Sequence, residues 1–302
     1  MGRSSGTPGP GRGIADGDSQ IPAGVLVPTT SLTGMIHPPL PSSIKVLPGT
    51  DVEGEWTRFA PFEAMHHLHE ICNPMSDASL NEVLSYLAPE DGDRMIDIAC
   101  GHGELLIRSA ELARIDGVGL DLSPWVLARA LERSRNRDLL GTVQWWLGDG
   151  SRIDKAEEWD VAACLGASWI WHGFKGTLAA LVSRTRPGGS IAIGDLRTKT
   201  GVDPSVITEA MGPDTSMTTE KDQVDALRAA GLEPIHCYVS PEDAWAGYHA
   251  LVIESADTYA GPEPAVDARA MAREWQREFE KDRKILEWTV WIARKPGHPA
   301  SP

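Results

Sequence analysis

The sequence has too few basic residues, paired cysteines and long apolar runs for several classes of protein. Its 302 residues include 28 Lys and Arg against 43 Asp and Glu, a formal net charge of −15, so no basic surplus exists to neutralise the phosphates of a nucleic acid. The four cysteines are scattered, with no Cys-x-x-Cys pair, which predicts reduced thiols and a cytoplasmic location. No stretch approaches 18 uninterrupted apolar residues, and the N-terminus lacks the apolar core of a signal peptide. We therefore expect no membrane partner and no secretory leader.

Composition divides the chain at about residue 50. The first 50 residues contain 17 Gly or Pro and only five charged residues, and such a segment buries too little apolar surface to offset the entropy of ordering it. We expect residues 1–50 to be a disordered or extended lead-in, inert rather than regulatory. Residues 55–295 have the pattern of one globular domain, and the hydrophobic content of 41% suffices for its core.

Strands and helices are predicted to alternate through this domain. After a helix capped by Ser76, five apolar strands are expected at about 94–99, 116–120, 142–147, 159–165 and 190–195, with helices near 103–114, 123–137, 151–157 and 174–185. This alternation predicts right-handed crossovers and a mostly parallel, doubly wound sheet. Ser123-Pro124 predicts a capped helix start, and Thr219 with Asp222 predicts the start of another helix, which Gly231 ends. Two further strands, 233–240 and 285–294, enclose a helical insert at 241–283. Its aromatic side chains fall near one helical face, and we expect it to be a lid over a substrate pocket.

The run Asp97-Ile-Ala-Cys-Gly-His-Gly103 follows the first of the five strands. Gly101 and Gly103 allow a tight turn into a helix, which would bring bare backbone N–H groups and a positive helix end up to a ligand. Eighteen residues after Gly103 the second strand ends in Asp121, a spacing that suits an acidic side chain bonding to ribose hydroxyls. A dinucleotide motif would need a third glycine where Leu106 stands, so a nicotinamide cofactor is disfavoured. We expect a small nucleotide-like molecule at this turn.

With Gly148-Asp-Gly150 after the third strand and Arg186-Pro-Gly-Gly189 before the fifth, the pattern resembles the class I S-adenosylmethionine-dependent methyltransferases over about residues 60–295. Two stretches, His69-Glu-Ile-Cys-Asn-Pro-Met-Ser76 and Cys164-Leu-Gly-Ala-Ser-Trp169, are similar to a bacterial subgroup that acts on small molecules. The resemblance implies an α/β, Rossmann-like, doubly wound seven-stranded mixed sheet with the last strand antiparallel, an N-terminal helical cover and the helical insert. It also implies S-adenosyl-L-methionine as cofactor, S-adenosyl-L-homocysteine as product and a small-molecule acceptor.

The resemblance assigns cofactor contacts to residues near the carboxyl ends of the strands. The turn that would meet the methionyl carboxylate comprises Asp97, Ala99, Cys100, Gly101 and Gly103. The ribose is assigned to Asp121 and Leu122, and the adenine to Gly148, Asp149 and Gly150. The methionyl arm is assigned to Asn73, Leu165, Gly166 and Ala167, and the sulfonium to the ring of Trp169.

Methyl transfer is a direct displacement at carbon, and holding the reactants aligned can supply roughly 7–11 kcal/mol of the barrier. A catalytic base is therefore optional. For a hydroxyl, thiol or acidic-carbon acceptor, the candidate bases are His172, Asp195 and His249. The subgroup has Glu-Pro-Tyr-Trp where this chain has Asp195-Leu-Arg-Thr198, which changes the wall of the acceptor pocket and leaves the acceptor open.

A cluster of His66, His67, His69 and Cys72 invites a zinc interpretation, but no second ligand pair occurs elsewhere at metal-site spacing. A segment that folds over the cofactor is favoured instead, and no metal is expected.

Two other functions stay open. A noncatalytic S-adenosylmethionine-binding regulator would have its acceptor space filled, and a cyclopropane synthase-like enzyme would need a base or bicarbonate site and a long apolar tunnel. Monomer and homodimer are not distinguished.

Overall fold

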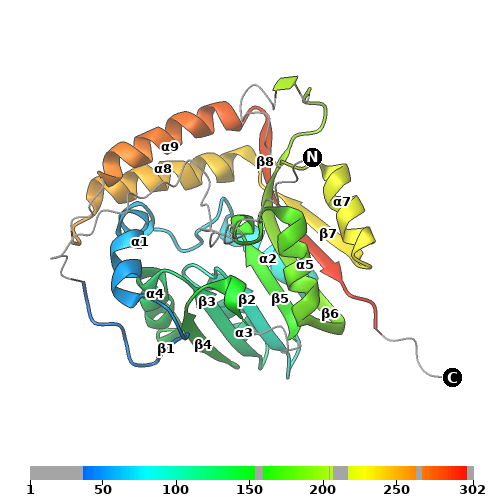
Figure 1. Ribbon diagram of the computed structural model, residues 1–302, viewed down its shortest axis with the longest axis horizontal. Helices are drawn as coiled ribbons and strands as arrows, with labels where there is room; N and C mark the ends of the chain where they lie inside the picture. Colours follow the sequence, from blue (N-terminus) through cyan, green and yellow to red (C-terminus); the bar gives the residue numbers. More distant parts are fainter. Residues whose placement is uncertain (1–36, 154–158, 204, 207–216, 263–266, 298–302) are drawn as a thin grey trace, which may run out of the picture.

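The structure is a computed structural model that describes residues 37–153, 159–203, 205–206, 217–262 and 267–297. Its centre is one sheet with the strand order β1-β4-β3-β2-β5-β6-β8-β7. The strands are β1 (Ile44–Val46), β2 (Arg94–Ile98), β3 (Asp116–Asp121), β4 (Thr142–Leu147), β5 (Trp159–Leu165), β6 (Thr185–Thr198), β7 (Glu233–Val239) and β8 (Leu286–Arg294). Strands β1 to β6 pair in parallel, whereas β8 is antiparallel to both β6 and β7. The predicted mixed sheet with an antiparallel last strand is confirmed (Figure 1).

The sheet has eight strands within the described ranges, so the predicted number of seven is wrong. The additional strand, β1, falls in the segment predicted to be a disordered or extended lead-in. Its Ile44 is 4% exposed and lies opposite Trp145 of β4. A strand of three residues between Pro41 and Pro48 has no periodicity that a sequence can reveal, because its order comes from pairing with a distant strand. Residues 1–36 of the predicted lead-in lie outside the described residues.

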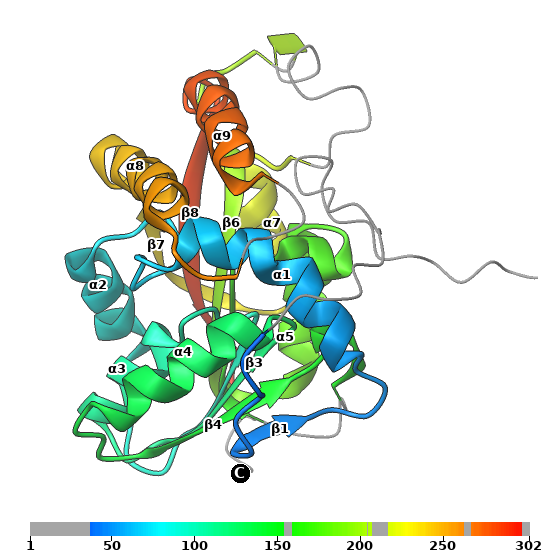
Figure 2. The same cartoon turned by 90° about the vertical axis from the view of Figure 1, so that its left-hand side faces the viewer.

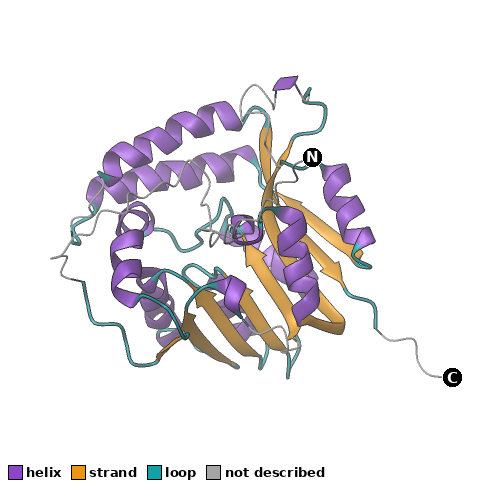
Figure 3. Cartoon of the chain, viewed as in Figure 1, coloured by secondary structure: helices purple, strands orange, loops and turns teal. Residues whose placement is uncertain are grey.

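Helices cover both faces of the sheet (Figure 3). They are α1 (Val52–His66), α2 (Asp77–Leu87), α3 (Glu104–Leu112), α4 (Pro124–Arg135), α5 (Phe174–Arg184), α7 (Glu220–Ala229), α8 (Glu242–Thr258) and α9 (Ala268–Asp282). Alternate residues of a strand point to opposite faces. Val161 and Ala163 of β5 therefore pack in the core layer of α2, α3 and α4, and Ala162 and Cys164 pack in the layer of α5 and α7. The sheet is doubly wound, as predicted.

Most helices begin where the sequence predicts. Ser76 caps α2, Ser123 caps α4 with Pro124 at its first position, and Thr219 forms a capping box with Asp222 at α7. The helix predicted at 151–157 is the exception. A short 3-10 turn, η2 (Gly150–Arg152), stands at its start, and residues 154–158 lie outside the described ranges.

Three helices lie across the carboxyl edge of the parallel strands (Figures 1 and 2). These roof helices are α1, α8 and α9, which contact one another. Met65 of α1 is buried in one apolar cluster with Val252 of α8 and Ala272 of α9. The insert thus packs on the N-terminal helical cover and, with it, faces the strand ends. No helix in the described part of the chain combines the length and apolarity of a bilayer span.

Candidate active site

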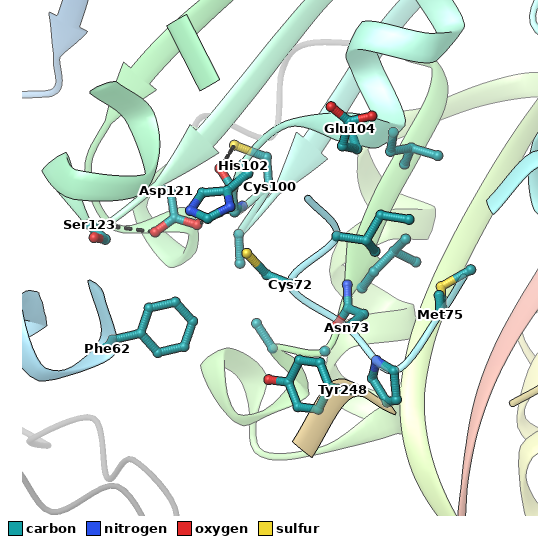
Figure 4. A pocket seen from close by; sticks show the side chains of 18 of the residues that line it. Phe62, Cys72, Asn73, Met75, Cys100, His102, Glu104, Asp121, Ser123 and Tyr248 are labelled. Carbon is teal, nitrogen blue, oxygen red and sulfur yellow. Dashed lines mark hydrogen bonds between the residues drawn. The ribbon is translucent and has the colours of Figure 1, made fainter. Parts of the chain in front are cut away.

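A cavity of about 470 Å³ lies between the carboxyl edge of the sheet and the roof helices. This volume falls in the range of small-molecule sites, roughly 300–1,000 Å³. Residues after β2, β3, β4 and β5 form one side of the cavity, which we call the floor, and residues of α1, α8 and α9 form the roof. In Figure 4, Asp121, Cys100 and His102 of the floor lie on one side, and Tyr248 of the roof and Asn73 lie on the other.

The glycine turn at the end of β2 has the conformation that its sequence predicts. The N–H of Gly103 donates to the carbonyl of Cys100 at 3.0 Å, and α3 begins at the next residue. Gly103 has a φ of +79°, and a Cβ at this position would stand 2.2 Å from the ring of Trp145. Only glycine fits both the left-handed backbone and the close ring. The tight turn that it allows places the start of α3 at the cavity.

Two carboxyl groups of the floor lie close to this turn, a buried one on Asp97 and a half-buried one on Asp121. Asp121 accepts hydrogen bonds from the N–H of Gly101 at 3.0 Å and of Ser123 at 2.8 Å, and burial raises its pKa to about 6 despite these donors. Asp97 is 3% exposed, and its Oδ1 has no hydrogen-bond partner in the described part of the chain. Burial, followed by the charge of Asp121, raises the pKa of Asp97 to about 7. The pair is suited to a cationic or hydrogen-bond-donating ligand.

The loop between α1 and α2 closes another side of the cavity. In the orientation that satisfies its amide, Asn73 donates to the carbonyls of Leu165 at 3.3 Å and Cys72 at 3.2 Å. Gly166 has a φ of +92°, and a Cβ there would stand 2.6 Å from the end of the Asn73 amide. Asn73 therefore ties this loop to the end of β5, beside a glycine that leaves it room.

Two histidines of α1 and the following loop bond to Tyr248 of α8. His66 is fully buried, and its Nδ1 lies 3.0 Å from the carbonyl of Phe62. A carbonyl only accepts, so Nδ1 carries the proton and Nε2 is an acceptor. The hydroxyl of Tyr248 therefore donates to Nε2 of His66, at 2.8 Å. By the same reasoning, Nε2 of His69 donates to the carbonyl of Tyr248, at 3.2 Å.

Burial, rather than these hydrogen bonds, keeps the two histidines neutral. Burial lowers the pKa of His66 well below its usual value, and the pKa of His102, in the glycine turn, to about 3. Of the cluster of His66, His67, His69 and Cys72, only Cys72 lines the cavity, and His66 and His69 are buried against α8. Across the described ranges, no three His, Cys, Asp or Glu side chains are arranged to hold a metal ion.

His249 of the roof is held in one tautomer. The indole N–H of Trp245 donates to its Nε2 at 3.1 Å, which places the ring proton on Nδ1. The ring stacks on Phe279 of α9 with a centroid separation of 4.1 Å. Burial lowers the pKa of His249 to about 4. Its one lone pair is already engaged, so this arrangement does not favour proton abstraction.

The chain is similar to known proteins in both sequence and structure. Residues 95–189 match the model of a family described as a methyltransferase domain. A SAM-dependent methyltransferase from Geobacter sulfurreducens, in complex with S-adenosyl-L-homocysteine, superposes with a TM-score of 0.69 and 25% identity, over 77% of this chain and 96% of that chain. This chain is a class I S-adenosylmethionine-dependent methyltransferase.

Two other relatives of this methyltransferase differ in how much of the chain they match. The uncharacterized protein YjhP from Escherichia coli is 28% identical over 194 residues, which make up 64% of this chain and 77% of that protein. The 27-O-demethylrifamycin SV methyltransferase from Amycolatopsis mediterranei is 28% identical over 153 residues, which make up 47% of this chain and 55% of that protein.

The cavity brings together most of the residues that the sequence singles out in this methyltransferase. Those that line it are Asn73, Asp97, Ala99, Cys100, Gly101, Gly103, Asp121, Leu122, Gly148, Gly150, Leu165, Gly166, Ala167, Trp169 and His249. Sequence reasoning did not select Tyr248, His66 or His102. His66 was interpreted as part of a cover, Tyr248 lies among the aromatic residues of the predicted insert, and His102 lies between the two glycines of the turn.

Three predicted residues lie elsewhere. The carboxylate of Asp149 accepts from the N–H of Ser151 at 2.8 Å and faces a second, smaller cavity. His172 is exposed at the end of the 3-10 turn η3 (Ser168–Trp171). Asp195 accepts from the N–H of Leu196 at 2.8 Å and from Ser168, and burial raises its pKa to about 6, but it is Leu196 that lines the cavity.

Proposed function

We propose that this methyltransferase transfers a methyl group to a small organic molecule, by in-line displacement, in the cavity under the roof helices. One observation carries this proposal: a single cavity joins the glycine turn and acids of the floor to aromatic side chains of α8 and α9. One relative is named for a small organic substrate, 27-O-demethylrifamycin SV. A net charge of −15 also disfavours a polyanionic acceptor. A cofactor-binding regulator has no need of the open space beneath α8 and α9.

We propose that the floor binds the cofactor, which supplies the methyl group on a sulfonium. The residues present fit such a ligand, because the unpartnered Oδ1 of Asp97 suits a cationic group and the start of α3 suits a carboxylate. The carboxylate of Asp121 is placed to accept from ribose hydroxyls as it accepts from the N–H groups of Gly101 and Ser123. The further floor residues that we assign to the cofactor are Ala99, Cys100, Gly103, Leu122, Gly148, Gly150, Leu165, Gly166, Ala167 and Trp169, with Asn73 beside them.

The adenine assignment of Asp149 is the weakest of the predicted contacts. Its carboxylate caps η2 and pairs with Arg152 at 3.4 Å, on the side of the second cavity. We therefore propose that the backbone at Gly148 and Gly150, which lines the main cavity, forms the wall near the adenine.

We propose that residues 241–283 cover the acceptor. Within the described ranges, this segment supplies Trp245, Tyr248, Trp275 and Phe279 to the roof. Apolar side chains of this kind exclude water and hold the acceptor against the methyl group, which favours a direct displacement.

We propose that Tyr248 and His66 accept the proton of a hydroxyl, amine or thiol acceptor. The hydroxyl proton of Tyr248 is committed to Nε2 of His66, so lone pairs of the phenol oxygen remain to accept from a ligand. During methyl transfer the proton of the acceptor would pass to the phenol oxygen of Tyr248, and the phenol proton would pass to Nε2 of His66. This relay would leave the positive charge on the imidazole of His66, although burial lowers the pKa of that ring well below its usual value.

Labelled S-adenosylmethionine, incubated with the protein and a pooled bacterial metabolite extract, tests the function. We expect at least one small compound to gain one methyl group by mass spectrometry, and the Asp121→Ala protein to give none above background. Calorimetry with S-adenosylhomocysteine checks the cofactor site first. Clear cofactor binding without any methylated compound would contradict the small-molecule acceptor, and no binding heat would contradict the cofactor site.

A further inference from the structure

The lining of the cavity is acidic, and within the described part of the chain arginines outside the lining pair with only two of its acids, Glu70 and Glu104. Its residues include Glu70, Asp97, Glu104, Asp121, Glu278 and Asp282, and no Lys or Arg among the described residues. Glu104 is neutralised behind the wall by Arg108 at 2.8 Å and Arg133 at 2.7 Å. Asp97, by contrast, is 3% exposed with an unpartnered oxygen. The cavity therefore has a negative field and no positive side chain to bind an anionic group.

Helix α9 contributes two of these acids from its inward face. Trp275, Glu278, Phe279 and Asp282 follow one another at helical spacing and all line the cavity. On this face Phe279 is buried, Asp282 is half-buried and Glu278 is exposed, so Glu278 stands where the cavity opens to solvent.

Two other acids of α9, Glu274 and Glu280, pair with arginines in or just after this helix. Glu274 pairs with Arg277 at 2.8 Å, and Glu280 pairs with Arg283 at 3.1 Å, both away from the cavity. The side chains of Glu278 and Asp282 have no salt bridge or hydrogen bond within the described part of the chain. Burial raises the pKa of Asp282, and the charge of Glu278 adds to this effect. Within the described residues, Glu274 and Glu280 therefore pair with arginines, whereas Glu278 and Asp282, which line the cavity, do not.

Aromatic rings line the same cavity as these two acids. Phe279 stacks with His249, and its centroid lies 5.5 Å from that of Trp245. Trp275 and Tyr248 complete this part of the lining. Ring faces attract both flat apolar molecules and organic cations.

We propose that the acceptor is a flat, apolar molecule with a protonated amino group and no anionic group, and that Glu278 and Asp282 bind this amino group. The inference rests on the proposed small-molecule methyltransferase function and specifies its substrate class. The amino group serves as an anchor, and the nucleophilic atom is a separate group that reaches the floor. An anionic acceptor would meet unpaired carboxylates and no cation, so the cavity selects against it.

Calorimetry on protein saturated with S-adenosylhomocysteine tests this class with three indoles of one shape: tryptamine, tryptophol and indole-3-propionate. They end in an ammonium, a hydroxyl and a carboxylate. We expect tryptamine to bind at least ~10-fold more tightly than indole-3-propionate, with tryptophol between them. The double variant Glu278→Gln, Asp282→Asn should weaken tryptamine binding at least ~5-fold and leave tryptophol unchanged.

The matched control is Glu274→Gln, Glu280→Gln, which removes the same charge from the outer face of α9. It should change the affinity for tryptamine less than twofold. Equal affinity for indole-3-propionate and tryptamine, or equal loss in both double variants, would overturn the proposal. So would the absence of binding by all three indoles at millimolar concentration while S-adenosylhomocysteine binds. Loss of S-adenosylhomocysteine binding itself would instead refute the proposed function.

Discussion

The hydroxyl of Tyr248 donates to Nε2 of His66 at 2.8 Å and so joins α8 to α1 within the roof. The bond has one direction, because Nδ1 of His66 is committed to the carbonyl of Phe62. His66 is fully buried, and Tyr248 lines the cavity, so the pair reaches from the acceptor space into the packed roof. One contact therefore has two consequences, one for the position of the insert and one for proton transfer.

Replacing Tyr248 by Phe separates these two consequences. The variant removes the oxygen that we propose to accept the proton, so kcat for a hydroxyl, amine or thiol acceptor should fall roughly 100-fold. Affinity for S-adenosylhomocysteine should change less than about twofold, since the floor is intact. The measurements are initial rates of label transfer to the methylated compound and calorimetry.

Tyr259→Phe is the matched control. Its hydroxyl is buried without a hydrogen-bond partner in the described part of the chain, so its removal should leave both rate and stability nearly unchanged. Tyr248→Phe, by contrast, leaves Nε2 of His66 unsatisfied and should lower the free energy of unfolding by about 1–3 kcal/mol. A normal rate in the Tyr248→Phe protein would show that the pair is only structural.

Asp121→Ala should weaken the binding of S-adenosylhomocysteine at least ~10-fold, about 1.4 kcal/mol. The side chain would lose its proposed bonds to the ribose and the acceptor that orients the N–H groups of Gly101 and Ser123. Asp116→Ala removes an exposed carboxylate from the opposite end of β3 and serves as the control. Unchanged affinity in Asp121→Ala, measured by calorimetry on folded protein, would contradict the assignment.

Cofactor affinity should rise with pH between about 5 and 8. Asp97, with a pKa raised to about 7, is largely protonated below that pH. A cationic ligand stabilises its carboxylate, so binding lowers this pKa and releases a proton. His102 and His249 stay neutral across this range, because burial lowers their pKa to about 3 and about 4.

Calorimetry in two buffers of different ionisation enthalpy counts the released protons. We expect release near pH 6.5 for the unaltered protein and a much smaller value for Asp97→Asn, with a flatter dependence of affinity on pH. Proton uptake on binding, or an identical profile in Asp97→Asn, would show that Asp97 does not meet the cofactor.

Features that depend on neighbouring residues could be predicted from the sequence. The caps at Ser76, Ser123 and Thr219 each bond to an N–H three residues ahead, and such local chemistry is readable in a single chain. The floor of the cavity was predictable for a related reason. Parallel strands end at one edge, so residues after successive strands meet there.

Features that depend on distant pairing could not be predicted. His66 and Tyr248 are 182 residues apart, and nothing in either segment indicates the other. The sequence made His249 a candidate base, but in the structure its Nε2 accepts a hydrogen bond from the indole N–H of Trp245. Asp149 stands at the predicted place in the sequence, but its carboxylate caps η2 and faces another cavity. Side-chain direction at a strand end depends on packing that periodicity does not encode.

The two glycines of the turn should differ in how well they tolerate alanine. Both have positive φ, +55° for Gly101 and +79° for Gly103, so each substitution carries a backbone cost of about 1 kcal/mol. A Cβ at Gly101 would lie 3.2 Å from that of Cys72, a small overlap, whereas one at Gly103 would lie 2.2 Å from the buried ring of Trp145. Trp145 is 1% exposed on β4 and has no room to move. Overpacking adds roughly 1–3 kcal/mol, so urea unfolding should show Gly103→Ala to be destabilised by about 2–4 kcal/mol and Gly101→Ala by about 1 kcal/mol. Equal destabilisation would mean that the ring of Trp145 does not support the turn. If Gly103→Ala is destabilised more than Gly101→Ala, as expected, the shape of the proposed cofactor site depends on the ring of Trp145 on the neighbouring strand.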